Sequence, residues 1–379
     1  MESAAAVKTD PVFFIAAVFF VRIYSLFSFV SLLPEFSFLQ NSSLAPFVLA
    51  SYPFFQAIGQ IPFGVLSDRY TPLRVMRYGL MVFALATVGC IIAPNALLFL
   101  CARSIQGLCA IGAPAQSWLA MQSSSSKQLQ SRYYLVGFAI VAGLLCGFIS
   151  ASCAQSLGNP VLIFWVTLCC VCLLIYQSYS FGPSHQESLN VKAEPLMYNL
   201  HITMIFIANA TLHFLQSFIL GGVHELCASF GGYSSAFVMS AGLVVSLFIC
   251  ASPLRLRDYH YSISYSVWLC IPVILLYPLY VCIPMAQELF AVISIVLIFA
   301  LLLLLDAALP TGLKKETQGT GLLLGLYNTF QYGSMSIGSL LTAYAARGNL
   351  FFGVSALATT VLIGTLLQIR CYKYAERSL

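Results

Sequence analysis

The sequence predicts an all-α polytopic membrane protein with twelve transmembrane helices in two six-helix halves. The chain has 379 residues, of which 60% are hydrophobic and only 8% are charged, whereas soluble domains carry about 25% charged residues. A spanning helix needs about 20 apolar residues, so this length accommodates about twelve spans with short connections. The apolar runs are unbroken, unlike the alternating segments of a membrane β-barrel. This composition excludes a disordered chain, a disulfide-rich secreted domain and a nucleic-acid-binding protein.

The individual spans follow from apolar segments that are separated by short polar breaks. In chain order they are predicted at 12–33, 44–66, 75–93, 96–121, 133–154, 161–181, 200–220, 234–251, 261–282, 289–309, 321–345 and 350–371. The most polar stretch of the chain, 182–197, follows the sixth span. Six helices, a polar linker and six more helices are the repeat organisation of many secondary transporters. We therefore expect an N-terminal half at 1–181, a cytoplasmic linker at 182–197 and a C-terminal half at 198–379.

The ends of the chain and its cysteines add no further element. The first ten residues are polar and the first apolar run is long enough to remain a span, so no cleavable signal peptide is expected. The chain ends a few residues beyond the last predicted span, so no additional domain is expected there. The 13 cysteines lie in apolar stretches or at their edges, and Cys169, Cys170 and Cys172 have no His or acidic neighbour. We interpret them as small hydrophobic side chains rather than a metal site.

The positive residues predict the orientation of the spans. With the N-terminus inside, fourteen of the 17 Lys and Arg residues fall in cytoplasmic parts of the chain. The outer loops hold only Arg347, while Arg22 and Arg103 lie within spans. Cytoplasmic loops of membrane proteins carry an excess of Lys and Arg. We therefore expect a multi-pass cell-membrane protein, in the inner membrane of a bacterium, with both termini in the cytoplasm.

Four ionisable residues lie inside predicted spans, where a charge is costly and therefore indicates function. They are Arg22, Arg103, His213 and Asp306, on spans 1, 4, 7 and 10. Neutral polar residues accompany two of them: Gln106 lies near Arg103 in span 4, and Asn209 and Gln216 lie near His213 in span 7. This recurrence on every third helix predicts one central polar cavity and an alternating-access carrier. Structural alternatives remain open: the arginines can satisfy carbonyl groups, His213 can be a packing residue, and Asp306 can be solvated at the inner end of its span.

Glycines recur on the equivalent fifth and eleventh spans. They are Gly137, Gly143 and Gly147 in the first half, and Gly321, Gly325, Gly333 and Gly338 in the second. Small residues let membrane helices approach closely and slide. The pattern is consistent with a gating role and equally with ordinary close packing.

The segment after the second span, Gly64-Val-Leu-Ser-Asp68-Arg69, resembles the loop signature Gly-x-Leu-Ala/Ser-Asp-Arg-x-Gly-Arg-Lys of the major facilitator superfamily. Gly64 permits a close helix approach. Asp68 is suited to cap the following helix or to pair across the interface between the halves, and Arg69 is a cytoplasmic anchor. The second part of the signature departs here, with Thr71, Pro72 and Leu73 in place of Gly-Arg-Lys.

A second resemblance narrows the branch. Arg103-Ser-Ile-Gln106-Gly107 in span 4 is similar to the Arg-x-x-Gln-Gly motif of drug/proton antiporters. Further elements resemble YajR-like transporters: Arg22 in span 1, Leu212-His213 in span 7, Asp306-Ala-Ala-Leu-Pro310 in span 10 and Gly325-Leu-Tyr-Asn-Thr-Phe-Gln331 in span 11. The Gly-Pro pair of the antiporter signature in span 5 is absent, since no proline lies between Arg132 and Pro160. The resemblance implies the twelve-helix major facilitator fold and proton antiport.

The predicted function is proton-coupled export of a small amphipathic or hydrophobic compound. A proton carrier must titrate in the working pH range, which favours Asp306 and His213, with Arg103 and Arg22 as electrostatic modulators. The expected substrate cavity contains the residues Gln106, Asn209, Gln216, Phe27, Tyr327 and Phe330.

Two alternatives remain: an importer or uniporter of a small metabolite, with an anionic metabolite as one case, and a protein that only senses or scaffolds. An enzyme is not expected, because the sequence holds no hydrolase, metalloprotease or phosphate-loop motif. We expect no cofactor and no metal, with the proton gradient as the energy source. The expected partners are a small-molecule substrate, protons and the lipid bilayer, with no nucleic acid, for a protein that works as a monomer.

Overall fold

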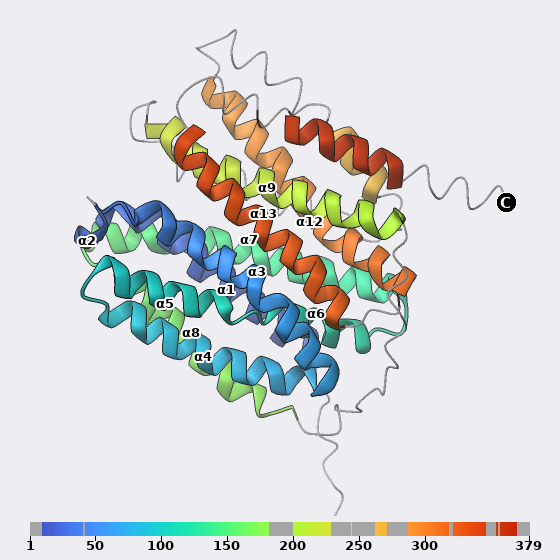
Figure 1. Cartoon of the computed structure of the whole chain (residues 1–379), viewed down its shortest axis with the longest axis horizontal. Helices are drawn as coiled ribbons and strands as arrows, with labels where there is room; N and C mark the ends of the chain where they lie inside the picture. Colours follow the sequence, from blue (N-terminus) through green and yellow to red (C-terminus); the bar gives the residue numbers. More distant parts are fainter. Residues whose placement is uncertain are drawn as a thin grey trace, which may run out of the picture.

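The computed structural model describes residues 10–40, 42–181, 200–228, 244, 262–270, 287–317, 321–345, 354 and 357–369. All regular elements in these ranges are helices (Figure 1), which confirms the all-α fold class. The linker predicted at 182–197 and nearly all of the span predicted at 234–251 lie outside the described residues. In the view of Figure 1, α9, α12 and α13 gather on one side of the bundle, and α4, α5 and α8 on the other.

The first six predicted spans are each found as helix. In chain order the elements are α1 (Pro11–Leu32), η1 (Leu33–Glu35), α2 (Ser37–Gln40), α3 (Ala45–Arg69), α4 (Pro72–Ile92), α5 (Ala96–Leu108), α6 (Gly112–Met121), α7 (Ser126–Ser156) and α8 (Leu162–Ser178). Their starts have local causes. The side chains of Asp10, Asn95 and Ser125 accept hydrogen bonds from the backbone N–H groups of Val12, Leu98 and Gln128. Such N-caps satisfy donors that the first turn of a helix leaves unpaired.

The second group of helices comprises α9 (Leu200–Ala228), α12 (Gln287–Thr317) and α13 (Gly321–Ala345). Residues 262–270 and 357–369 are also helical. These elements coincide with the spans predicted at 200–220, 289–309 and 321–345, and with parts of those predicted at 261–282 and 350–371.

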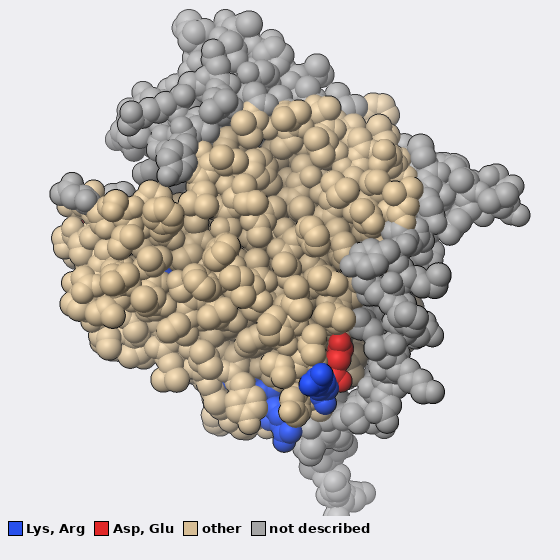
Figure 2. Space-filling view, viewed as in Figure 1, with Lys and Arg blue, Asp and Glu red and all other residues tan. Residues whose placement is uncertain are grey.

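The described helices suit a membrane. Four of them are long and apolar enough to cross one by length and composition: Pro11–Val30, Pro72–Ile92, Ala96–Met121 and Ser126–Ser156. Figure 2 shows a face whose described surface is almost free of charge, with the few charged side chains gathered near one edge. An uncharged band with charges at its margin is the surface that a bilayer requires.

Glycines bring the first and fifth spans of each half together. In the N-terminal half α7 packs on α1, and a Cβ added to Gly143 would lie 2.5 Å from the carbonyl oxygen of Phe20. In the C-terminal half α13 packs on α9, and a Cβ on Gly338 would lie 2.7 Å from the carbonyl oxygen of Phe214. Gly143, Gly147 and Gly338 of the predicted pattern therefore serve close packing inside each half.

A third close approach joins the halves. α13 packs along α3, and the glycines Gly64, Gly321 and Gly325 line this seam. A Cβ on Gly325 would lie 2.6 Å from the carbonyl oxygen of Gln60, and a Cβ on Gly64 would overlap the carbonyl oxygen of Gly321. Only glycine allows two helix backbones to approach this closely.

Span 4 is broken, although the sequence predicts one continuous segment at 96–121. α5 ends at Leu108, Cys109 and Ala110 are not helical, and α6 begins at Gly112. The new N-terminus is capped from another helix, because the Gln60 side-chain oxygen accepts a hydrogen bond of 3.0 Å from the backbone N–H of Ala113. Broken spans occur where the freed backbone groups find protein partners, frequently near binding sites.

Candidate functional site

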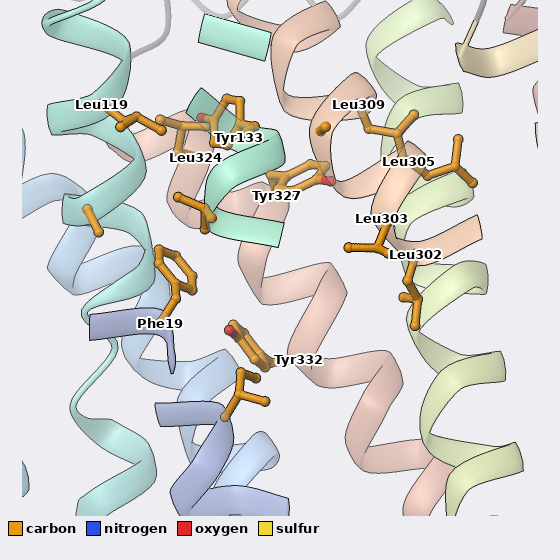
Figure 3. Close-up of a cluster of buried hydrophobic side chains, with 14 of the residues drawn as sticks. Phe19, Leu119, Tyr133, Leu302, Leu303, Leu305, Leu309, Leu324, Tyr327 and Tyr332 are labelled. Atoms are coloured by element: carbon orange, nitrogen blue, oxygen red, sulfur yellow. The ribbon is translucent and has the colours of Figure 1, made fainter. Parts of the chain in front are cut away.

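A polar cavity of about 40 Å³ lies where α1, α6, α7, α9, α12 and α13 meet. Its polar lining comprises Gln116, Tyr133, His213, Gln216, Asp306, Tyr327, Gln331 and Tyr332. Four residues that line the cavity, Phe19, Tyr133, Tyr327 and Tyr332, belong to the buried cluster that Figure 3 shows. Pockets for drug-sized ligands measure about 300–1,000 Å³, so in this conformation the cavity accommodates only water-sized groups.

The cavity contains an ion pair between two spans. His213 Nε2 on α9 lies 3.2 Å from Asp306 Oδ1 on α12. The side chain of His213 is 2% exposed, while that of Asp306 is 19% exposed. The structure therefore brings together the two residues that the sequence proposes as proton carriers. Asp306 is the more accessible member of the pair, and both line the cavity.

Hydrogen bonding fixes the tautomer of His213. Its Nδ1 lies 2.9 Å from the backbone oxygen of Asn209, and a carbonyl oxygen can only accept, so Nδ1 carries a hydrogen. Nε2 then faces Asp306 Oδ1 either with a second proton or with its lone pair. A proton placed between the two side chains would be shared by both, and without it a carboxylate would face a lone pair.

Pro310 modifies the backbone beside this pair. It lies inside α12 and lines the cavity. A proline in a helix has no N–H, so the carbonyl of Asp306, four residues earlier, loses its usual helical donor. The Asp-Ala-Ala-Leu-Pro element thus places a carboxylate and a freed carbonyl on the same turn.

Arg22 lies behind one wall of the cavity. Its guanidinium carbon is 5.5 Å from the ring centre of Phe19 and 5.7 Å from that of Tyr332, and both rings line the cavity. Its Nη2 donates a hydrogen bond of 3.3 Å to the hydroxyl of Tyr332, which joins α1 to α13 across the two halves. The residue is 3% exposed.

Arg103 is fully buried and belongs to a polar cluster within the N-terminal half. Its Nη1 donates to Gln106 Oε1 at 2.5 Å, and Gln106 in turn donates to Thr87 at 2.9 Å and to Ser25 at 3.5 Å. The guanidinium lies over the rings of Phe29 and Tyr52, 4.8 and 4.9 Å from their centres. Gln106 thus connects spans 1, 3 and 4.

The residues of the superfamily-like loop meet the other half at one end of the seam between α3 and α13. Asp68 Oδ1 accepts from the backbone N–H of Gly321 at 2.7 Å, and Oδ2 accepts from that of Leu322 at 2.9 Å. The carboxylate therefore caps the N-terminus of α13 rather than that of the following helix, α4. Arg69 is exposed beside it. An anionic cap at a helix N-terminus is favourable because of the unpaired N–H groups and the helix dipole.

The other predicted site residues divide between the central cavity and its surroundings. Gln216 and Tyr327 line it, and Gly107 lets α5 approach Tyr52 of α3 closely. Asn209 donates to the backbone oxygen of Tyr327 at 2.9 Å and supports the cavity wall. Phe27 lines a second cavity, and Phe330 is 49% exposed and stacks on Phe206. Phe330 therefore offers no surface to the central cavity in this conformation.

The second cavity, also about 40 Å³, adjoins the first. It lies between α1, α3, α7, α9 and α13, and its lining is mostly apolar. Met335 lines both cavities. This second cavity lies toward the end of the bundle opposite Asp68, since its lining includes Val30 near the end of α1 and Leu49 near the start of α3.

Several polar contacts of the site are absent from the sequence-based list. Gln116 on α6 accepts a buried hydrogen bond of 2.9 Å from Asn328 on α13, and Tyr332 meets Arg22. Asn328 belongs to the span-11 element Gly325–Gln331, whose resemblance to YajR-like transporters was the signal that could have identified it. In the part of the chain that the structure describes, no group of three metal-ligating side chains is present.

The fold and this site define a class of protein: a polytopic helical membrane protein whose spans surround a central polar cavity, as in membrane transporters. The family follows from the sequence itself. The profile of the Major Facilitator Superfamily matches residues 12–370, and the chain belongs to this superfamily of transporters.

Curated relatives are distant. An uncharacterized transporter of Buchnera aphidicola subsp. Schizaphis graminum (strain Sg) is 22% identical over 267 residues, which are 67% of this chain and 68% of the relative. The inner membrane transport protein YajR of Escherichia coli (strain K12) is 23% identical over 349 residues, 86% of this chain and 75% of YajR.

Solved structures of the superfamily share the fold. The proton:xylose symporter XylE superposes with a TM-score of 0.76 at 12% sequence identity, covering 94% of each chain. FucP in the outward conformation superposes with a TM-score of 0.72 at 15% identity, covering 95% of this chain and 99% of FucP. These likenesses agree with the twelve-helix fold that the sequence predicts.

Proposed function

We propose that this protein is a proton-coupled secondary transporter that exports a small amphipathic or hydrophobic compound by alternating access, as the drug/proton antiporter motif in span 4 suggests. The observation that carries the coupling is the contact between His213 Nε2 and Asp306 Oδ1, which lie 3.2 Å apart, with both residues lining the central cavity. A buried pair of this kind responds to a pH gradient, because each protonation state favours a different arrangement of the two side chains.

The pair offers a simple coupling step. When the shared proton is present, His213 and Asp306 attract one another and hold α9 against α12. When the proton leaves, the carboxylate faces a lone pair and the contact between the two spans weakens. Loading and release of the proton from opposite sides of the membrane then bias the packing of the C-terminal half.

The seam between the halves supplies the gate in this proposal. At the end of the bundle that carries Asp68, the carboxylate of Asp68 caps α13 of the other half. At the same end, Ser262 accepts a hydrogen bond of 3.3 Å from Gln130 and forms one of 3.1 Å with the hydroxyl of Tyr134. The distribution of Lys and Arg predicts that this end faces the cytoplasm. The conformation described here is then closed to the cytoplasm.

The test uses purified protein in liposomes with a trapped pH dye, challenged with lipophilic cations, antibiotics and small metabolites under an imposed proton gradient. A substrate-dependent proton flux is expected from the natural protein and is expected to disappear in Asp306→Asn. Asparagine keeps the size of the side chain and removes its titration. Glu35→Gln is the matched control, because this exposed carboxylate accepts a hydrogen bond from the surface residue Gln155, away from the cavity.

Unchanged proton flux in both Asp306→Asn and His213→Ala, in correctly inserted protein, would refute the coupling role. Substrate movement without any proton flux would instead favour the second candidate, an importer or uniporter of a small anionic metabolite. The observation that favours this second candidate is the burial of Arg22 and Arg103. It predicts uptake without a proton gradient and loss of uptake in Arg22→Ala.

A further inference from the structure

The N-terminal half buries two permanent positive charges without a carboxylate partner. Arg22 is 3% exposed and Arg103 is 0% exposed. In the described ranges the ion pairs are Arg132–Asp10 and His213–Asp306, and neither includes these two arginines. Arginine does not deprotonate in proteins, and a buried charge without a counter-charge is strongly unfavourable. The arrangement therefore lacks a negative group.

The free hydrogen-bond donors show where that group binds. Nε and Nη1 of Arg22, Nε and Nη2 of Arg103, and Nε2 of Gln60 are buried and have no hydrogen-bond acceptor among the described residues. Nε and Nη2 lie on the same edge of a guanidinium, which is the edge that binds the two oxygens of a carboxylate in parallel. Arg103 thus presents an unused carboxylate-binding edge.

The two arginines belong to one continuous polar region. The Tyr52 ring centre lies 4.9 Å from the Arg103 guanidinium carbon, and the Tyr52 side chain also neighbours Arg22. Ser25, one turn after Arg22 on α1, receives a hydrogen bond from Gln106, which also binds Arg103. Gln60 connects this region to the break in span 4, because its side-chain nitrogen and Arg22 Nη1 both lie within 3.3 Å of the position that a Cβ on Gly112 would occupy.

This region also borders the central cavity and has apolar walls. Phe19 and Tyr332 separate the Arg22 guanidinium from the cavity, and Phe29 and Tyr52 lie against Arg103. In this conformation the hydroxyl of Tyr332, from the other half, accepts one hydrogen bond from Arg22. A negatively charged group of a ligand would replace this neutral acceptor when the halves separate.

We propose that Arg22, Arg103 and Gln60 bind the carboxylate of the transported compound, so that the substrate class is an amphipathic monocarboxylate. The charged head meets the guanidinium groups, and the apolar body lies against the aromatic rings and the apolar lining of the second cavity. This inference rests on the proposed transport function and narrows its substrate.

The experiment measures binding to purified full-length protein in detergent, in a buffer of a large sulfonate at constant ionic strength. The probes are sodium hexanoate, its neutral isostere hexanamide, and sodium chloride. Trp118, which is buried on α6, serves as the fluorescence reporter. The other two tryptophans, Trp165 and Trp268, are 52% and 68% exposed and are replaced by phenylalanine. Thermal unfolding is recorded in parallel, since a ligand that binds only the folded state raises the unfolding temperature.

Hexanoate is expected to change the Trp118 emission saturably, whereas hexanamide and chloride do not. Arg22→Gln and Arg103→Gln are each expected to weaken hexanoate binding about tenfold or more, since each removes a charge-assisted hydrogen bond. Lys127→Gln, which removes an exposed cation at the start of α7, leaves the affinity unchanged. If a glutamine variant fails to fold, Arg22→Lys and Arg103→Lys keep the charge and are expected to bind hexanoate with intermediate affinity.

An equal response to chloride would assign the region to an inorganic counter-ion and overturn the proposed substrate class. An equal response to hexanamide would also overturn the proposed substrate class, because hexanamide carries no charge. Hexanoate affinity that is unchanged in both glutamine variants would overturn the role of the arginines. The binding experiment and the proton-flux experiment can fail separately. Hexanoate binding without proton flux would refute only the transport proposal. Proton flux without hexanoate binding would refute only the carboxylate site.

Discussion

At the scale of single residues, the hydrogen bond between Gln116 and Asn328 joins α6 to α13 in the interior. The two side chains are 8% and 2% exposed, and Asn328 Nδ2 donates to Gln116 Oε1 at 2.9 Å. Removal of one partner leaves the other polar group buried and unpaired. Replacement of both by apolar groups removes this penalty.

We predict that Gln116→Leu and Asn328→Leu each lower the free energy of unfolding by about 1–3 kcal/mol, and that the double variant loses less than the sum. Denaturant unfolding of the purified protein in detergent measures all four species. Gln155→Leu, which breaks an exposed contact to Glu35, is the control and is expected to change the stability by about 0.5 kcal/mol or less. Strictly additive losses would mean that the two amides do not interact.

The ionisable members of the site could be identified from sequence because a charge in hydrocarbon is rare and costly. That reasoning found Arg22, Arg103, His213 and Asp306, and the structure pairs the last two. It missed the contact between Gln116 and Asn328, which are 212 positions apart. A neutral amide is tolerated on several helix faces, and its partner depends on which spans pack together, so local sequence does not specify the pair.

At the scale of helices, the seam between α3 and α13 depends on the absence of side chains. A Cβ on Gly64 would overlap the carbonyl oxygen of Gly321, which belongs to a backbone and cannot rotate away. On the same seam, a Cβ on Gly333 would meet only the Ala57 Cβ, at an ordinary distance of 3.9 Å. These two glycines therefore make a matched comparison.

Gly64→Ala is expected to destabilise the described conformation by about 1–3 kcal/mol, the usual cost of overpacking, while Gly333→Ala has little effect. Thermal unfolding in detergent provides the first measurement, and the transport rate in liposomes the second. Equal effects of the two substitutions would show that the seam does not constrain the chain at Gly64.

Most helices could be predicted from apolar length alone, but the break in span 4 could not. Pro114 has no N–H and would clash with the carbonyl of Ala110 in a continuous helix. Prolines 53, 62 and 310 nevertheless lie inside unbroken helices, so proline by itself does not predict a break. The additional cause is Gln60 on another helix, whose side chain satisfies the exposed N–H of Ala113.

At the scale of the whole molecule, the charge distribution predicts which loops face the cytoplasm. Ser124 and Asn159 are exposed in the turns before and after α7, and these turns lie at opposite ends of that helix. In a background without native cysteines, we expect a membrane-impermeant maleimide outside intact cells to label Asn159→Cys. Ser124→Cys should react only after permeabilisation, and the reverse pattern would invert the proposed topology.

The cap of α13 by Asp68 predicts the balance between conformations. Asp68→Asn removes the negative charge at the helix N-terminus, and a loss of about 1–2 kcal/mol changes a population five- to thirtyfold. In inside-out vesicles, a cysteine at the cavity residue Gln331 is therefore expected to react with an impermeant maleimide about fivefold faster or more in the Asp68→Asn background. Arg69→Gln, the neighbouring exposed charge, is the control.

A reaction rate that is equal in the Asp68→Asn and Arg69→Gln backgrounds would show that the cap does not hold the halves together.

The interruption of span 4 also has a mechanical consequence. α5 packs against α3 and α4 within its own half, whereas α6, only 10 residues long, is the part of this span that packs against α13 of the other half. A rigid span would transmit any rocking of α13 along its whole length. A span that is interrupted at residues 109–111 can bend there. We therefore expect α6 alone to follow a movement of α13. Arg103 lies on α5 and is hydrogen-bonded to Gln106 of the same helix, so we expect it to keep this contact when α6 moves with α13.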